Sequence, residues 1–150
     1  MTEQLQLEVN LIAQAVATFG MFGVIWLVQL GTYPLQVHVP PENFVDYQAA
    51  HMRRITYVVG PLMLVEAGTA AWLLFIPMCG CGLTLSWVGM GLVFLVWIST
   101  IVLQVPCHWK LERGRDDAAI RRLVATNWVR TLGWTARAVV VGWLLVLQMG

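Results

Sequence analysis

The sequence has 150 residues, the length of one domain, and 59% of them are apolar while 11% are charged. Soluble domains carry about 25% charged residues, so this chain cannot cover a water-soluble globule with polar side chains. A net charge of +1 without a long lysine or arginine tract excludes nucleic acid as a partner.

Four long apolar segments predict four membrane spans. A helix needs about 20 apolar residues to cross a hydrocarbon layer of about 30 Å. Runs of this length without alternation favour helices over a β-barrel. We therefore expect an all-α bundle of four transmembrane helices with up-down topology, forming a single domain over residues 1–150. The spans run from about Val9 to Gly31, Tyr57 to Ile76, Thr84 to Val105 and Thr126 to Leu147.

The polar connections before the second and fourth spans also show helical signals. Pro40 and Pro41 precede a stripe of residues at spacings of three and four, namely Phe44, Tyr47, His51 and Ile55. Asp116 is placed to cap a helix that leads into the fourth span. Helices two and four are therefore expected to extend into the cytoplasm. Close helix packing is expected at the small residues Gly20, Gly23, Gly89 and Gly91.

The distribution of basic residues predicts the orientation of the bundle. Short cytoplasmic loops carry an excess of lysine and arginine. The basic loop residues are Arg53 and Arg54, then Lys110, Arg113, Arg115, Arg121 and Arg122. The tail before Val9, the Cys79 to Gly82 turn and the C-terminus have none. Both termini are therefore expected on the non-cytoplasmic side, with Cys107 across the membrane from Cys79 and Cys81.

Two ionisable residues lie inside the apolar spans. Glu66 and Arg137 fall at similar depths, and an ionisable group within a bilayer normally faces a partner in the bundle. We predict that these two side chains form an intramembrane ion pair. Such a pair serves as a clamp between helices, and a role in proton relay or ligand binding stays open.

A larger polar group gathers at the predicted cytoplasmic end. Asn127, Arg130, Trp134 and Arg137 follow helical spacing, so they share one face of the fourth span. The other helices bring polar residues to the same level, namely Tyr33, His38, His51, Arg54, Gln104, His108 and Trp109. A histidine there has the pKa range of a general base. The three histidines lack the paired spacing of a metal motif, so no metal site is predicted.

Several short motifs together resemble a known family. They are Tyr33-Pro34, Pro40-Pro41-Glu42-Asn43, His51-Met52-Arg53-Arg54, Gly60-Pro61, Val105-Pro106-Cys107-His108 with Leu111, and Asn127-Trp128-Val129-Arg130-Thr131. In this order they resemble the anthrone-oxygenase-like family of small four-span membrane proteins, over nearly the whole chain. Many relatives have asparagine where this chain has His108.

The resemblance implies an activity and a set of residues. A few fungal members oxidise anthrones to anthraquinones without an obvious cofactor, and most bacterial members have no established activity. It implies a bacterial inner membrane as the location, and it points to a catalytic group of His51, Arg54, His108, Asn127 and Arg130. Tyr33, Gln104 and Trp134, from the polar layer, would contact the ligand.

Two hypotheses about function follow. The first is a cofactor-independent oxidoreductase that acts on a lipid-soluble phenolic or quinone-like substrate. The alternative is an accessory subunit of a larger membrane complex, or a protein that binds a hydrophobic ligand or pigment, in which the polar layer anchors the ligand. Either protein contacts the lipid bilayer and is compatible with a homo-oligomer. Transport through Glu66 and Arg137 is a third reading, which four helices without inverted repeats support least.

Overall fold

The chain is a bundle of four long helical rods, as the sequence predicts. The computed structural model describes residues 3–77 and 80–149, so Cys79 lies outside the described residues. These ranges contain helices and no strand. All four rods are long and apolar enough to cross a membrane, and in chain order they are Glu3–His38, Pro41–Leu73, Cys81–Leu111 and Asp117–Gln148. The bounds in chain order are α1 Glu3–Leu27, η1 Val28–Thr32, α2 Tyr33–Leu35, η2 Gln36–His38, α3 Pro41–Leu73, α4 Cys81–Ser99, η3 Thr100–Gln104, α5 Val105–Leu111 and α6 Asp117–Met149.

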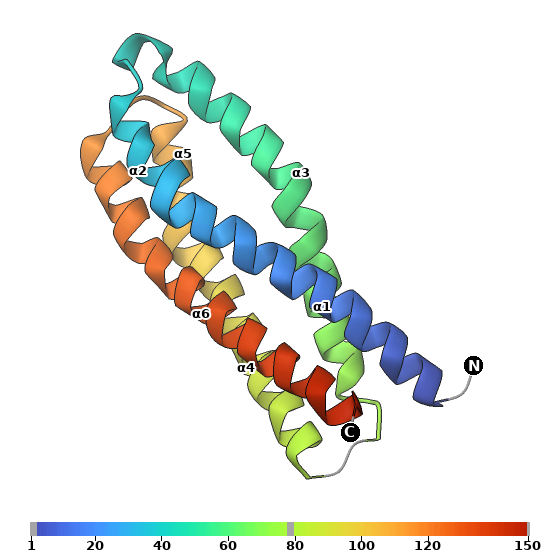
Figure 1. The fold of residues 1–150 in the computed structure, drawn as a ribbon. Coiled ribbons are helices and arrows are strands. Elements are labelled where there is room, and N and C mark those ends of the chain that lie inside the picture. The colour runs from blue at the N-terminus through green and yellow to red at the C-terminus, as the bar shows by residue number, and fades with distance from the viewer. Residues whose placement is uncertain (1–2, 78–79, 150) are drawn as a thin grey trace.

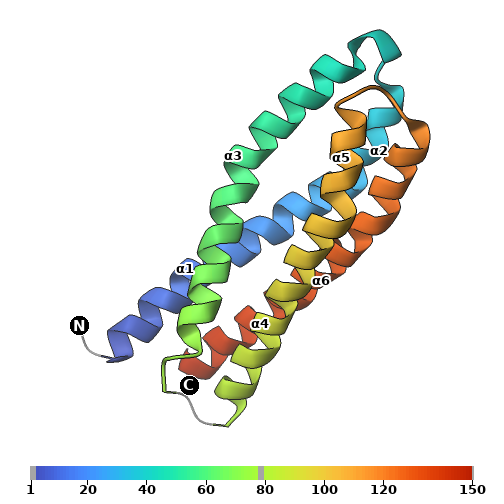
Figure 2. The same cartoon turned by 180° about the vertical axis from the view of Figure 1, so that it is seen from behind.

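The rods alternate in direction. Figure 1 shows the chain ends at the same end of the bundle as the connection from α3 to α4, and the other two connections at the opposite end. This opposite end, formed by residues 36–41 and 112–116, is called the loop end below. Seen from behind in Figure 2, α4 and α5 form one rod beside α6. α1 packs against α3 and α6, and α4 packs against α3 and α6.

Two π-helical segments interrupt the first and third rods. In η1 the Tyr33 N–H donates to the Val28 carbonyl, and in η3 the Val105 N–H donates to the Thr100 carbonyl. Each segment lies just before a proline, Pro34 or Pro106. Proline lacks an N–H and its ring clashes with the carbonyl four residues earlier, so a wider turn before it relieves the conflict. The rods therefore continue past both prolines to the loop end.

Local capping explains where the helices at the loop end begin. The Ala119 N–H donates to the Asp116 carboxylate over 2.8 Å, so the predicted N-cap of α6 is confirmed. Lys110 forms an ion pair of 2.6 Å with Asp116 and so ties the end of α5 to the start of α6. At α3, Pro41 occupies the first helical position, where the missing N–H removes no helical bond. Both helices extend beyond the apolar spans, as predicted.

The interior contains apolar layers separated by polar ones. A layer around Leu11, Leu73 and Leu144 lies toward the chain ends, and a layer around Phe44, Leu111 and Leu123 lies at the loop end. Lipid removes most of the hydrophobic driving force between spans, so close packing and polar contacts hold such bundles together. Most exposed large side chains are apolar, which fits a surface that faces acyl chains.

Glycines permit close approach at fewer positions than predicted. A Cβ atom at Gly89 would lie 2.3 Å from the Arg137 guanidinium, and one at Gly20 would touch Leu62 at 3.4 Å. The same atom at Gly23 or Gly91 would meet nothing within 4 Å, so the prediction was wrong for these two glycines, which face outward. Gly133 is a close contact that sequence spacing missed, since its Cβ would lie 2.5 Å from Val96.

Candidate functional site

The centre of the polar layer is His108 on α5, which is buried. Its Nε2 lies 3.1 Å from the Tyr33 hydroxyl, and its Nδ1 lies 2.9 Å from the Gln48 amide nitrogen. Gln48 in turn accepts a hydrogen bond of 3.4 Å from Gln36. An amide nitrogen only donates, so Nδ1 is the acceptor and Nε2 carries the proton. His108 therefore donates to Tyr33, and the tyrosine proton stays free to donate elsewhere.

A second buried network joins α6 to the π segment of the first rod. Asn127 donates to the Gln29 side-chain oxygen over 2.9 Å, and Thr131 donates to the same oxygen over 3.2 Å. The Gln29 amide donates to the Val124 carbonyl over 3.2 Å. Arg130 donates to the Asn127 oxygen over 3.2 Å, which orients the guanidinium. Asn127 therefore acts as a positioning residue and does not line the cavity described next.

Between α3 and the other rods lies a cavity of about 240 Å³. Its walls are mostly apolar, and its larger polar side chains are Tyr33, Gln104, His108 and Arg130, while Thr56 of α3 and Thr100 add hydroxyl groups. Gln104 is held by hydrogen bonds with Ser99 and Thr126. The remaining lining residues are Met21, Val24, Ile25, Val28, Met52, Ile55, Thr56, Val59, Gly60, Met63, Thr100 and Val105.

Arg130 is a buried cation without an anionic partner. It is 6% exposed, and no carboxylate of the described residues lies within ion-pair distance. Its guanidinium lies 5.1 Å from the centre of the Trp134 ring, and its Nε has no hydrogen-bond acceptor. A buried charge that lacks compensation is costly, particularly inside a bilayer. The cavity therefore presents a cationic donor to whatever enters it.

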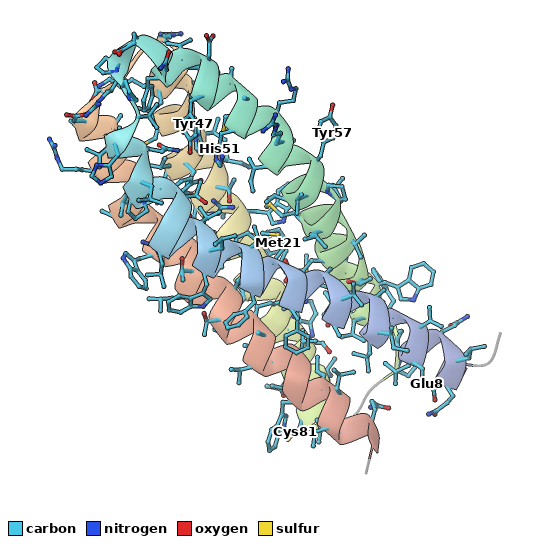
Figure 3. All side chains as sticks on the ribbon, turned by 45° about the horizontal axis from the view of Figure 1, so that its top comes forward. Glu8, Met21, Tyr47, His51, Tyr57 and Cys81 are labelled. Atoms are coloured by element: carbon cyan, nitrogen blue, oxygen red, sulfur yellow. The ribbon has the colours of Figure 1, made fainter. Side chains whose placement is uncertain are left out.

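Two predicted catalytic residues line a neighbouring space. His51 and Arg54 line a hollow between α3 and Thr32 of the first rod and are not among the residues that line the cavity around His108, although the His51 ring meets the Tyr33 ring edge-on with centroids 6.3 Å apart. The His51 ring stacks on Tyr47 with centroids 6.2 Å apart, and in Figure 3 both side chains lie between α3 and the rest of the bundle, near the loop end. His38 is exposed. No three His, Cys, Asp or Glu side chains among the described residues gather closely enough to hold a metal ion.

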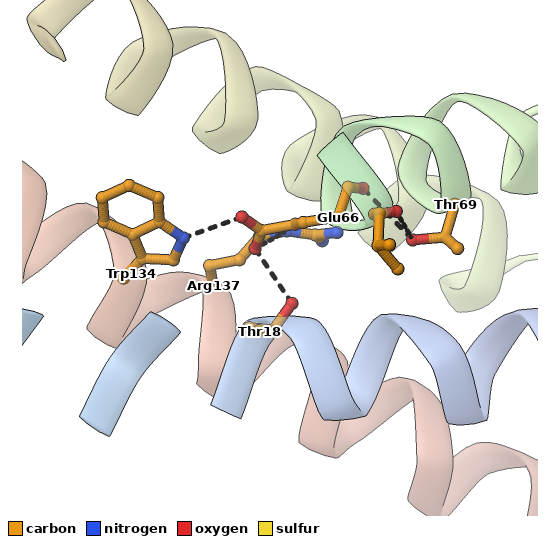
Figure 4. Close-up of polar contacts among 6 residues, drawn as sticks. Thr18, Glu66, Thr69, Trp134 and Arg137 are labelled. Atoms are coloured by element: carbon orange, nitrogen blue, oxygen red, sulfur yellow. Dashed lines mark hydrogen bonds and ion pairs between the residues drawn. The ribbon is translucent and has the colours of Figure 1, made fainter. Parts of the chain in front are cut away.

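The predicted ion pair between Glu66 and Arg137 is confirmed. The Arg137 Nε lies 3.3 Å from a Glu66 carboxylate oxygen, and both side chains are almost fully buried. The same carboxylate accepts hydrogen bonds of 2.9 Å from Thr18 and 2.7 Å from Trp134, as Figure 4 shows. Trp134 was expected to contact a ligand, yet its indole N–H is directed at Glu66. The group joins α1, α3 and α6.

Two further residues complete the surroundings of Arg137. With its amide oxygen turned toward the donors, Gln14 accepts hydrogen bonds of 3.2 Å from the Ala70 N–H and 3.2 Å from the Arg137 guanidinium. The guanidinium fits against α4 because Gly89 has no side chain there. These contacts give the Arg137 guanidinium polar partners and the space it occupies. The buried group around Glu66 and Arg137 therefore has the features of a structural clamp between all four rods.

Sequence reasoning missed several of these polar residues. Thr18 and Gln14 lie in an apolar segment free of charge, and Gln29 and Gln48 also belong to apolar faces. A buried glutamine within a span needs partners in the bundle, so the glutamines themselves were an available signal.

No protein-family model matches the chain, and no detectable relative was found among curated proteins or solved structures. The fold and the buried polar groups define the class, an integral membrane bundle of four spans with a mostly apolar cavity that contains a few polar side chains.

Proposed function

We propose that the cavity binds a small lipid-soluble compound through a phenolic or carbonyl oxygen, and that the protein is a cofactor-independent oxidoreductase acting on this compound. The observation that carries the proposal is the buried guanidinium of Arg130, which lines the cavity and lacks a carboxylate partner among the described residues. The cavity volume of about 240 Å³ is below the about 300–1,000 Å³ of pockets for drug-sized ligands, which favours a small ligand.

The polar lining is suited to an oxygen that accepts hydrogen bonds. Because His108 donates to Tyr33, the tyrosine proton is free to donate to a ligand. Arg130 adds charged donors beside it. Fixed donors in a dry site stabilise a developing oxygen anion by several kcal/mol, about 3–4 for one donor in a known hydrolase. The site therefore favours the ionised form of a phenol or enol over the neutral form.

This preference gives the oxidoreductase hypothesis a chemical basis. An ionised enol is electron-rich and reacts with dioxygen, which is the co-reactant required here. For an anthrone, the ring CH₂ and O₂ become a ring carbonyl and water, so carbon is oxidised and both oxygen atoms are reduced. His108 acts through Tyr33 in this scheme, which differs from the general-base role expected from sequence.

The test uses the purified protein in detergent with two probes. Binding of 1-naphthol is followed by the absorption change that accompanies its ionisation, and turnover of anthrone is followed by dioxygen consumption. We expect Arg130→Gln to reduce naphthol ionisation at least tenfold, and Tyr33→Phe to weaken it several-fold. Arg122→Gln is the matched control, because Arg122 is an exposed arginine on the same helix.

The outcomes separate the two hypotheses. Naphthol binding with dioxygen consumption supports the enzyme, whereas binding without consumption supports the alternative of a ligand-binding or accessory protein. If Arg130→Gln ionises naphthol as well as the unchanged protein does, the proposed site is wrong.

A further inference from the structure

A second hollow lies next to the cavity, between α3 and the end of the first rod. It has a volume of about 350 Å³ and is lined by Thr32, Tyr47, Ala50, His51, Arg54, Ile55 and Val58. Among the described residues, Ile55 alone lines both this hollow and the cavity around His108. The two spaces therefore present different side chains, and the hollow is not used by the function proposed above.

The polar groups of this hollow are donors without partners. Arg54 is exposed and forms no ion pair with any described carboxylate. Among the serines and threonines that the structure describes, Thr32 alone makes no side-chain hydrogen bond. The Tyr47 hydroxyl also lacks a partner, while its ring stacks on His51. No aspartate or glutamate lines the hollow.

The position of the hollow matches the boundary of a bilayer. Thr32 ends the π segment of the first rod, and Tyr57, where the apolar part of α3 begins, follows Arg54 by less than one turn. In Figure 3 Tyr57 points away from the bundle, while Tyr47 and His51 lie near the loop end. Ile55 and Val58 give the hollow an apolar side toward the membrane. The Arg54 guanidinium thus lies where lipid headgroups are found, above a surface suited to acyl chains.

We propose that this hollow binds the phosphate of an anionic membrane phospholipid. Arg54 is positioned to donate two parallel hydrogen bonds to phosphate oxygens, a geometry that the guanidinium fork favours. Thr32 and Tyr47 add hydroxyl donors, and the apolar side holds the start of an acyl chain. Basic pockets between membrane helices are a recurring form of headgroup recognition. The absence of a lining carboxylate removes the repulsion that would oppose an anion.

The experiment measures the thermal unfolding of delipidated protein in an uncharged detergent. The additives are phosphatidylglycerol, phosphatidylcholine and diacylglycerol with matched chains, and inorganic phosphate. We expect phosphatidylglycerol to raise the unfolding temperature most and inorganic phosphate to leave it unchanged. Arg54→Gln should lose most of this rise, while Arg54→Lys should keep part of it.

A neighbouring arginine supplies the control. Arg53 is also exposed but does not line the hollow, so Arg53→Gln should keep the full response to phosphatidylglycerol. Thr32→Val is a second variant and should raise the lipid concentration needed for half of the response several-fold. The proposal is overturned if Arg53→Gln and Arg54→Gln behave alike, if phosphatidylcholine or diacylglycerol acts as strongly, or if inorganic phosphate gives the same rise.

Discussion

Removing one member of the ion pair between Glu66 and Arg137 should cost far more than removing one hydrogen bond between helices. Glu66→Gln keeps one of the two acceptor oxygens, which Thr18 and Trp134 use separately, and leaves the Arg137 cation buried without an anion. Arg137→Met keeps an unbranched side chain without the charge and leaves the carboxylate with neutral donors. Removing one partner of a buried pair costs about 3–5 kcal/mol. Interhelical hydrogen bonds in membranes average about 0.6 kcal/mol, so the unpaired charge should dominate both losses.

The double variant distinguishes this reasoning from a simple sum of contacts. With both charges removed, no buried ion is left unpaired, and replacing a buried pair by neutral groups is often close to neutral. We expect the Glu66→Gln, Arg137→Met variant to lie within about 2 kcal/mol of the unchanged protein. The free energy of unfolding is measured by reversible titration with sodium dodecyl sulfate in mixed micelles, followed by circular dichroism.

Arg121→Met is the matched control, since Arg121 is exposed on the same helix as Arg137. It should change the free energy of unfolding by less than about 0.5 kcal/mol. If the losses of the two single variants simply add in the double variant, the buried charges do not depend on each other, and the account of the clamp is refuted.

Three further predictions concern packing, capping and orientation. Gly89→Ala should lower the unfolding temperature because its Cβ would lie 2.3 Å from a guanidinium nitrogen, whereas Gly91→Ala, with open space, should leave it unchanged. The hydrogen bond from Lys110 and the backbone N–H at the start of α6 hold the pKa of the Asp116 carboxyl below its ordinary value. That stabilisation is present above the ordinary aspartate pKa and is lost as the pH falls through the lowered one, so Asp116→Asn should lower the unfolding temperature at neutral pH but not in strong acid. If the basic loops are cytoplasmic, Cys81, in a chain whose other cysteines are serine, should react with an impermeant maleimide only from the non-cytoplasmic side.

Sequence reasoning was sufficient where one physical constraint dominated. Lipid forces long apolar helices and draws rare charges together, so the spans and the pair of Glu66 with Arg137 were predictable. A side-chain oxygen at the right position caps a helix in any context, so the cap by Asp116 was predictable too.

Residue spacing could not predict that the polar layer is split between the cavity around His108 and a neighbouring hollow. Depth alone placed His51 and Arg54 in one site with His108. The His51 ring does contact Tyr33, the hydrogen-bond partner of His108, but His51 and Arg54 line the neighbouring hollow and not the cavity. The orientation of α3 depends on its packing against α1 and α4, which no local pattern encodes. The wider turns before Pro34 and Pro106 also change which residues face inward, because spacing arguments assume a regular α-helix.

Because of the π segments, the residues at the loop end could change orientation without a change in the membrane-spanning part of the bundle. A π turn is an α-helix with one extra residue, so deleting one residue from η1 would restore the regular pitch and rotate everything after it by about 100°. Tyr33 would then swing away from His108, while the ion pair deeper in the membrane would keep its place. One-residue insertions or deletions at these two positions could therefore vary the ligand chemistry of such a protein without rebuilding its membrane-spanning body.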